Sequence, residues 1–237
     1  MARGTTLGDL VTKLKAEAGH SSAINLTVDK ADAFKQTLRH VQEQLYYDYD
    51  WPHLRIVASK TMAAGSRFYD VPVDATYGTI NFDRIEAVEC EYNDSFIEVG
   101  RGIGFGEYNQ YDPADDERSD PVLRWDVRWT GSKAQIEVWP LPSSATKLWF
   151  RGIRDLSALT SNSDTADLDD NMIVLYAAAE ILARQKSEDA RAKLAAAQSL
   201  YARLKGRSKG ASPMTVYGGG DDHRTSRTHG TVIRISG

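Results

Sequence analysis

The chain has 237 residues, of which 41% are hydrophobic, and its formal net charge is −4. A chain of this length and composition can bury one substantial core or two small ones. The single cysteine, Cys90, excludes an intrachain disulfide and a cysteine-rich zinc site. The N-terminal residues lack the apolar run of a secretion signal, and no stretch approaches the roughly 18 apolar residues of a membrane span. We therefore expect a protein that is made and used in water.

The charge is distributed unevenly along the chain. Residues 206–237 contain five basic and two acidic residues, which gives this segment +3 and leaves −7 on residues 1–205. Non-specific affinity for nucleic acid comes chiefly from Lys and Arg that replace counterions. The acidic part of the chain is therefore not expected to grip DNA, and only the C-terminal segment has the charge to do so.

Apolar residues recur at helical spacing from the N-terminus. Thr6 followed by Asp9 is typical of a helix start, and the apolar residues between Leu7 and Ala18 fall on one face. A second, longer amphipathic helix is predicted to be capped by Asp29. Trp51-Pro52 is expected to end it, because proline disfavours helical geometry in the residue before it.

The apolar period changes to two after the second helix. Seven segments alternate like strands, and no helical pattern lies between them: 54–58, 67–71, 80–92, 96–99, 125–129, 135–139 and 148–153. Such a series predicts a largely antiparallel sheet that is folded as a sandwich or a barrel.

The helical period returns near Met172, where Asp169 and Asp170 are placed to complement the amide dipoles of a helix start. A fourth helix from Ala190 is expected to end at Gly206. We predict an α+β fold: a four-helix domain from residues 1–52 and 157–205, an inserted antiparallel β domain at 53–156, and an extended C-terminal tail at 206–237.

No catalytic or metal-binding pattern emerges from the sequence. The histidines lack metal-ligand spacing, and neither a nucleophile elbow nor a P-loop occurs. The segment from Gly100 to Gly106 has a glycine at every second position, which is typical of either a flexible contact loop or a twisted strand end. The acidic residues between Asp112 and Asp120 lack the glycine and glutamate of an EF-hand, so a solvated loop is favoured. We predict no catalytic residue, cofactor or metal.

Four aromatic residues crowd the end of the second helix: Tyr46, Tyr47, Tyr49 and Trp51. Either they form a core at the hinge between the two domains, or they contact a neighbouring subunit, since aromatic residues are enriched at interface cores. Rings so close together on one helix end cannot all point inward. We therefore expect at least one of them to face solvent or a partner.

The tail is too polar and glycine-rich to build a core, yet it closes on residues that alternate like a strand. One interpretation is a disordered terminus without a role. The other is a segment that gains order by adding to the edge of a partner's sheet. The candidate partner-binding residues are Met214, Val216, Tyr217, Thr231, Val232, Ile233, Arg234 and Ile235.

The order of these features resembles the head-to-tail connector, or adaptor, proteins of tailed bacteriophages, including the tail tubular protein A type. The stretches that carry the resemblance are 50–54 (DWPHL), 65–74 with its YDVPVD ending, 84–88 (RIEAV), 170–180 (DNMIVLYAAAE) and 188–190 (EDA). Together they span most of residues 5–205. The segment from Gly100 to Asp120 has no counterpart in the family pattern.

The resemblance implies a helical domain with an inserted β domain, and twelve copies in a ring under the portal of the DNA-filled head. It implies a virion protein of the neck, assembled in the host cytoplasm. Its partners would be the portal protein, a tail or nozzle protein and further copies of itself, and the tail would reach into the portal. DNA would pass through the channel without specific binding.

Three alternatives remain on the sequence alone. The first is a tail completion protein further down the tail, which has a similar structural role. The second is a nucleic-acid-binding module that uses the basic tail, although five cationic side chains over 32 residues are few for this purpose. The third is a hydrolase whose carboxylates converge only in the fold, which a concave pocket with perturbed acids would support.

Overall fold

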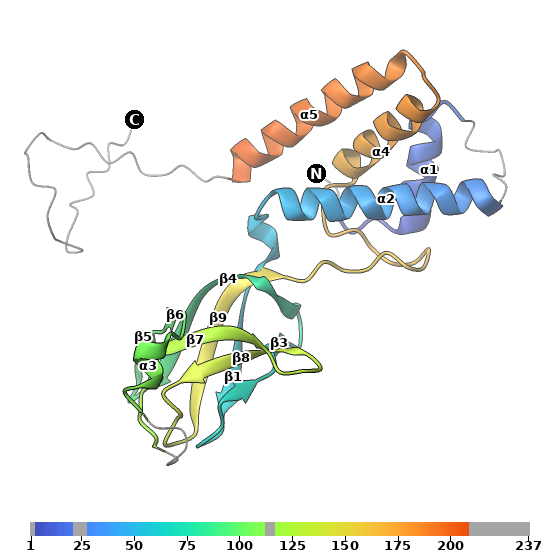
Figure 1. The fold of residues 1–237 in the computed structure, drawn as a ribbon. Helices are drawn as coiled ribbons and strands as arrows, with labels where there is room; N and C mark the ends of the chain where they lie inside the picture. Colours follow the sequence, from blue (N-terminus) through green and yellow to red (C-terminus); the bar gives the residue numbers. More distant parts are fainter. Residues whose placement is uncertain (1–2, 21–27, 112–116, 209–237) are drawn as a thin grey trace, which may run out of the picture.

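The structure, a computed structural model, describes residues 3–20, 28–111 and 117–208. Helices and strands gather in separate parts of the molecule, which the short helix η1 (Pro52–Leu54) and residues 155–169 connect (Figure 1). The helical part contains α1 (Leu7–Glu17), α2 (Val28–Asp48), α4 (Asp170–Arg184) and α5 (Asp189–Ser208). The fold combines helices with mixed sheets and is therefore α+β, as predicted.

Two of the predicted helix starts are confirmed in detail. The Thr6 hydroxyl accepts a hydrogen bond from the Asp9 amide at 3.2 Å and caps α1. The Asp169 carboxylate accepts one from the Met172 amide at 3.1 Å and caps α4. Each side chain satisfies an amide that has no partner within the helix.

The predicted bounds of the other two helices are wrong. Helix α2 already begins at Val28, so Asp29 lies inside it and not at its start. This helix ends at Asp48, three residues before Trp51, which instead precedes η1. Gly206 does not end α5, which continues to Ser208. A glycine within a helix is unfavourable by only about 1 kcal/mol, and Lys205 and Arg207 complement the dipole at this helix end.

The strands form two sheets. The first has the order β1-β9-β4-β3, with β5 also paired to β4, and the second has the order β2-β8-β7-β6. The strands are β1 (Arg55–Met62), β2 (Phe68–Tyr69), β3 (Val73–Asp74), β4 (Gly78–Tyr92), β5 (Ser95–Glu98), β6 (Gly100–Arg101), β7 (Arg124–Trp129), β8 (Ala134–Trp139) and β9 (Thr146–Arg154). Neighbouring strands are antiparallel except β6 and β7, which are parallel.

All seven predicted strand segments coincide with strands, whereas β3, β6 and the short helix α3 (Phe105–Tyr108) were not foreseen. These three elements have two to four residues each, which is too short for a periodicity to appear. The glycine-rich segment begins as a strand end, because Gly100 and Arg101 form β6. The chain then turns into α3, which packs on the outer face of the second sheet through Tyr108.

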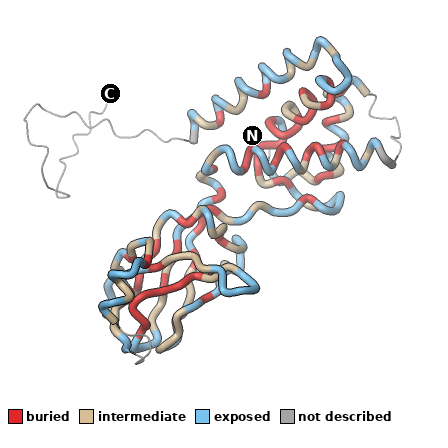
Figure 2. The backbone as a smooth tube through the Cα atoms, viewed as in Figure 1, coloured by how far each residue is buried: buried red, intermediate tan, exposed pale blue. Residues whose placement is uncertain are grey.

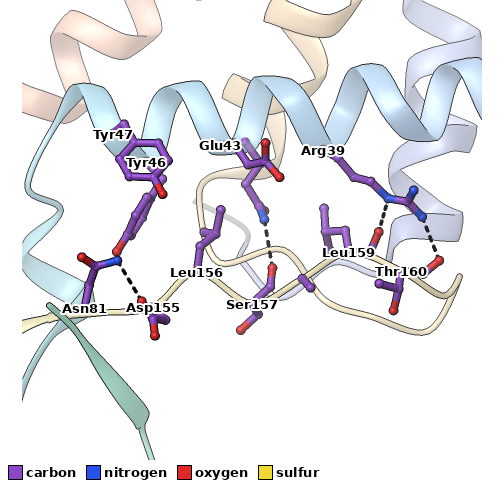
Figure 3. A pocket seen from close by; sticks show the side chains of 12 residues that line it. Arg39, Glu43, Tyr46, Tyr47, Asn81, Asp155, Leu156, Ser157, Leu159 and Thr160 are labelled. Atoms are coloured by element: carbon purple, nitrogen blue, oxygen red, sulfur yellow. Dashed lines mark hydrogen bonds between the residues drawn. The ribbon is translucent and has the colours of Figure 1, made fainter. Parts of the chain in front are cut away.

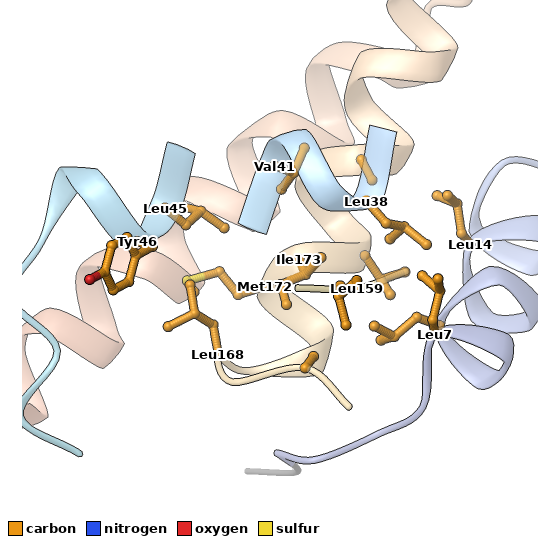
Figure 4. Close-up of a cluster of buried hydrophobic side chains, with 14 of the residues drawn as sticks. Leu7, Leu14, Leu38, Val41, Leu45, Tyr46, Leu159, Leu168, Met172 and Ile173 are labelled. Atoms are coloured by element: carbon orange, nitrogen blue, oxygen red, sulfur yellow. The ribbon is translucent and has the colours of Figure 1, made fainter. Parts of the chain in front are cut away.

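The buried apolar residues form two large clusters (Figure 2). The helical cluster is built around Leu7, Leu38, Met172 and Ile173, all fully buried (Figure 4). It also includes Leu204 from α5. The second cluster lies between the two sheets. It takes Ile80, Leu148 and Phe150 from the first sheet and Ile136 and Val138 from the second.

The strand β4 bends where it approaches the helical part. Its register with β9 shifts between Ile80 and Ile85 and again between Ile85 and Ala87. Gly152 of β9 lies opposite the bend, where an added Cβ would stand 2.6 Å from the Arg84 carbonyl oxygen. A glycine is therefore required for the close approach that places Arg84 at the end of α2.

Candidate functional site

Arg84 joins the sheet to the last turn of α2. Its guanidinium donates to the Tyr46 carbonyl at 2.7 Å and to the Asp50 carboxylate at 3.0 Å, and its Cζ lies 4.5 Å from the centre of the Tyr46 ring. The last turn of α2 has no basic residue of its own. The Arg84 cation therefore supplies the charge that a helix C-terminus favours, and it does so from the other part of the molecule.

We expect Arg84→Ala to lower the free energy of unfolding by about 1–3 kcal/mol, because the Tyr46 carbonyl loses its donor and Asp50 its counter-ion. Denaturant unfolding measures the change. The matched control is Arg151→Ala. The Arg151 side chain is 58% exposed and forms a single ion pair with Glu86, at 3.6 Å, so we expect the free energy of unfolding to fall by less than about 0.5 kcal/mol. Equal effects of the two substitutions would show that Arg84 does not hold the junction.

The segment between β9 and α4 is fixed by polar contacts at its two ends. Arg154 forms an ion pair with Asp167, whose carboxylate also accepts from the Ser157 amide at 2.7 Å. His53 lies 2.9 Å from the Asp167 carbonyl, and burial lowers the pKa of this histidine below its usual 6.5. These contacts join the two ends of the segment, residues 154–157 and Asp167, and hold it in place beside α2, where it forms a wall.

A groove of about 680 Å³ lies between α2 and this wall (Figure 3). Arg39 bridges it at one end, donating to the carbonyls of Leu159 and, at 2.8 Å, of Thr160. At the other end Asn81 donates to Asp155 at 2.8 Å. The wall of the groove is thus held to α2 and to β4 by hydrogen bonds.

The sequence left open whether the crowded aromatic residues form a core between the two domains or contact a partner, and Tyr46 and Tyr47 differ in this respect. Tyr46 is buried and donates its hydroxyl to the Arg154 carbonyl at 2.9 Å, and burial raises the pKa of this phenol above its usual 10.0. Tyr47 is 71% exposed, which confirms that one ring faces outward. Tyr46 therefore belongs to the junction, while Tyr47 is available for contact with a partner.

Tyr47 and Glu43 separate the groove from a second one of about 660 Å³ on the other side of α2, which His40, Gln44 and Tyr176 also line. The two side chains thus form a ridge between two hollows. An aromatic ridge of this kind is suited to binding, because tyrosine contributes large contact area at interfaces.

A second polar centre lies on the outer face of the second sheet. The carboxylate of Glu137 is 1% exposed and accepts from Tyr108 at 2.7 Å, Arg128 at 2.6 Å and Arg67 at 2.7 Å. Burial by itself raises the pKa of Glu137, but these hydrogen bonds outweigh it and hold the pKa below its usual 4.5. The centre fastens α3 to the sheet and is a structural feature.

The candidate residues of the tail, from Met214 to Ile235, lie outside the described residues, as do Asp112, Asp115 and Asp116 of the acidic loop. Within the described ranges, no group of three or more His, Cys, Asp or Glu side chains is placed to hold a metal ion. No helix in those ranges is long and apolar enough to cross a membrane. We take the two grooves beside α2 as the candidate functional surface, because the exposed Tyr47 and Glu43 stand between them.

Comparison with known proteins decides the class. A family model described as SU10 adaptor protein matches residues 5–218. The chain belongs to this family. It is accordingly a bacteriophage adaptor, a structural component of the virion that associates with other head or tail proteins, and its family is not one of enzymes. None of the curated proteins that were compared matches the chain.

Proposed function

We propose that the protein is the head-to-tail adaptor of its phage, docked on the portal as a ring of twelve copies. The ring extends the DNA channel and gives the tail a platform. The observation that carries the proposal is the family match over residues 5–218, together with the resemblance of the sequence to connectors of the tail tubular protein A type. We further propose that the two buried clusters are the cores of two domains and that copies assemble on the portal as a template.

The charge of the chain agrees with a channel through which DNA moves. Residues 1–205 have a net charge of −7. A channel wall built from these residues offers few cations to replace the counterions of a DNA duplex. We expect negligible affinity for duplex DNA at physiological salt. A gel shift measures it, and a tight complex with a steep salt dependence would instead favour binding of nucleic acid through the basic tail.

The C-terminal tail is proposed as the attachment device, with Ile233 and Ile235 as anchors. In an added strand these two side chains face the same way. Burying both contributes roughly 3–6 kcal/mol, whereas ordering the segment costs about 2–5 kcal/mol, so a single tail would hold weakly. Tails that engage together in a ring gain avidity of roughly 10²–10⁴.

We expect the double change Ile233→Asp and Ile235→Asp to abolish attachment to the portal while the melting temperature stays the same. Binding to purified portal and thermal unfolding are the two measurements. The single change Val232→Asp, on the opposite side of the strand, is the matched control and is expected to weaken attachment less. Docking with unchanged affinity by the double variant, or by a chain that ends at Ser212, would exclude the tail as the anchor.

A further inference from the structure

The outward face of α2 carries a continuous line of exposed residues. Ala33, Gln36, His40, Glu43 and Tyr47 are separated alternately by three and four positions, which places them on one side of the helix. The buried face of the helix is occupied by a different set that includes Leu38 and Val41. At its C-terminal end the line becomes the ridge of Glu43 and Tyr47, with a groove on each side.

Helix α5 exposes a line of the same spacing. It consists of small residues alone: Ala192, Ala195, Ser199, Ala202 and Gly206. On the opposite side of α5, Ala197 is fully buried and Leu204 packs in the helical cluster. Small side chains leave room for the backbone of another helix to come close, and a ridge of large side chains fits such a surface. Both helices are roughly 30 Å long, so the two lines match in length.

The charges beside the two lines are complementary. Beside Tyr47, α2 exposes Glu43, while the C-terminal half of α5 exposes Arg203 and Arg207. Asp48 and Lys205 are engaged within the chain, since both form hydrogen bonds with the Tyr201 hydroxyl. Glu43 and Arg203 are both exposed, and neither forms an ion pair with another described residue. Opposite charges across a contact favour its formation and fix its register.

Each line faces away from the helical cluster, because the buried residues of α2 and of α5 lie on the other side of each helix. Helix α4 packs against both α2 and α5 and stands between them (Figure 1), and the outer side of α5 is exposed along most of its length (Figure 2). A surface that meets a different surface of the next copy produces a head-to-tail contact, which closes into a ring when the rotation permits. We therefore expect the surface that contacts the α2 ridge to belong to a second copy of this chain.

We propose that the α2 ridge of one copy packs against the small-residue line of α5 in the next copy, with Glu43 beside Arg203. This inference rests on the proposed ring and specifies the contact that builds it. The helices run in the same direction in this arrangement, because the acidic end of one line then meets the basic end of the other.

The test uses phage particles assembled with variants of the full chain, and the readout is the number of copies in each particle. Glu43→Arg and Arg203→Glu, introduced singly, each place like charges across every contact, and we expect a loss of at least about tenfold. The chain with both changes restores opposite charges at every contact and is expected to regain incorporation. A double variant no better than the singles would overturn the proposal.

A steric variant provides an independent measurement. Ser199→Trp fills the centre of the small-residue line and is expected to abolish incorporation, while the purified chain keeps the melting temperature of the unaltered protein. Ala183→Trp, exposed on α4 and outside both lines, is the control and is expected to be incorporated. Normal incorporation of Ser199→Trp would contradict the contact. If the unaltered chain is itself missing from the neck of the particle, the proposed function fails as well, which separates the two outcomes.

Discussion

Replacing Glu137 by alanine is expected to lower the free energy of unfolding by about 3 kcal/mol. The substitution removes the carboxylate to which Arg67, Arg128 and Tyr108 all donate. It leaves Arg67 without its ion-pair partner and Arg128 with the more distant Asp126 carboxylate, at 3.7 Å. Breaking a buried ion pair destabilises a protein by about 3–5 kcal/mol. The lower end applies here, because the Arg128 side chain is 42% exposed and water compensates part of its loss.

The stability that Glu137 contributes should depend on pH. Its pKa in the folded protein lies below the usual 4.5, so the folded state favours the ionised carboxylate. The contribution is therefore fully present above the pKa of the unfolded chain and is lost as the pH falls through the folded pKa. Denaturant unfolding of the unaltered protein and of Glu137→Gln at a series of pH values measures this, with exposed Glu98→Gln as the control. A difference that grows toward low pH would contradict the network.

Leu38→Ala is expected to lower the free energy of unfolding by about 2–5 kcal/mol. Leu38 is fully buried where α1, α2 and α4 meet (Figure 4), so its truncation loses the transfer free energy of the side chain and leaves a cavity. The control is Leu194→Ala on α5, where the leucine is 41% exposed, and a change within about 0.5 kcal/mol is expected. Similar losses at both positions would show that the helical cluster is not packed as described.

The long elements could be predicted from sequence because each has a pattern that repeats several times. Helix α4 has a capping aspartate and a sustained apolar period, and β4 alternates over many residues. Predictions from one or two residues were less accurate, because tertiary contacts compete with such local signals. Gly206 is a common stop signal, yet α5 passes through it. The parallel pair of β6 and β7 depends on two residues whose neighbours lie more than twenty positions away.

The functional surface was only partly foreseeable. The crowding of Tyr46 and Tyr47 indicated that one ring must face outward, and Tyr47 does. The role of Arg84 could not be read from the sequence, because it depends on the bend in β4 and on the space beside Gly152. The grooves required the path of residues 155–160 along α2. In the Glu137 centre, partners that lie 9 to 70 positions from it meet only in the folded sheet.

Imaging the neck of intact particles by electron microscopy tests the head-to-tail assignment most directly. The account predicts a closed ring of this chain directly beneath the portal, with the DNA channel through its centre and residues 231–235 of each copy added to portal strands. Within that ring, α5 of each copy should lie on α2 of the next. Density for the chain further down the tail, with another protein in contact with the portal, would contradict the assignment and identify a tail completion protein instead.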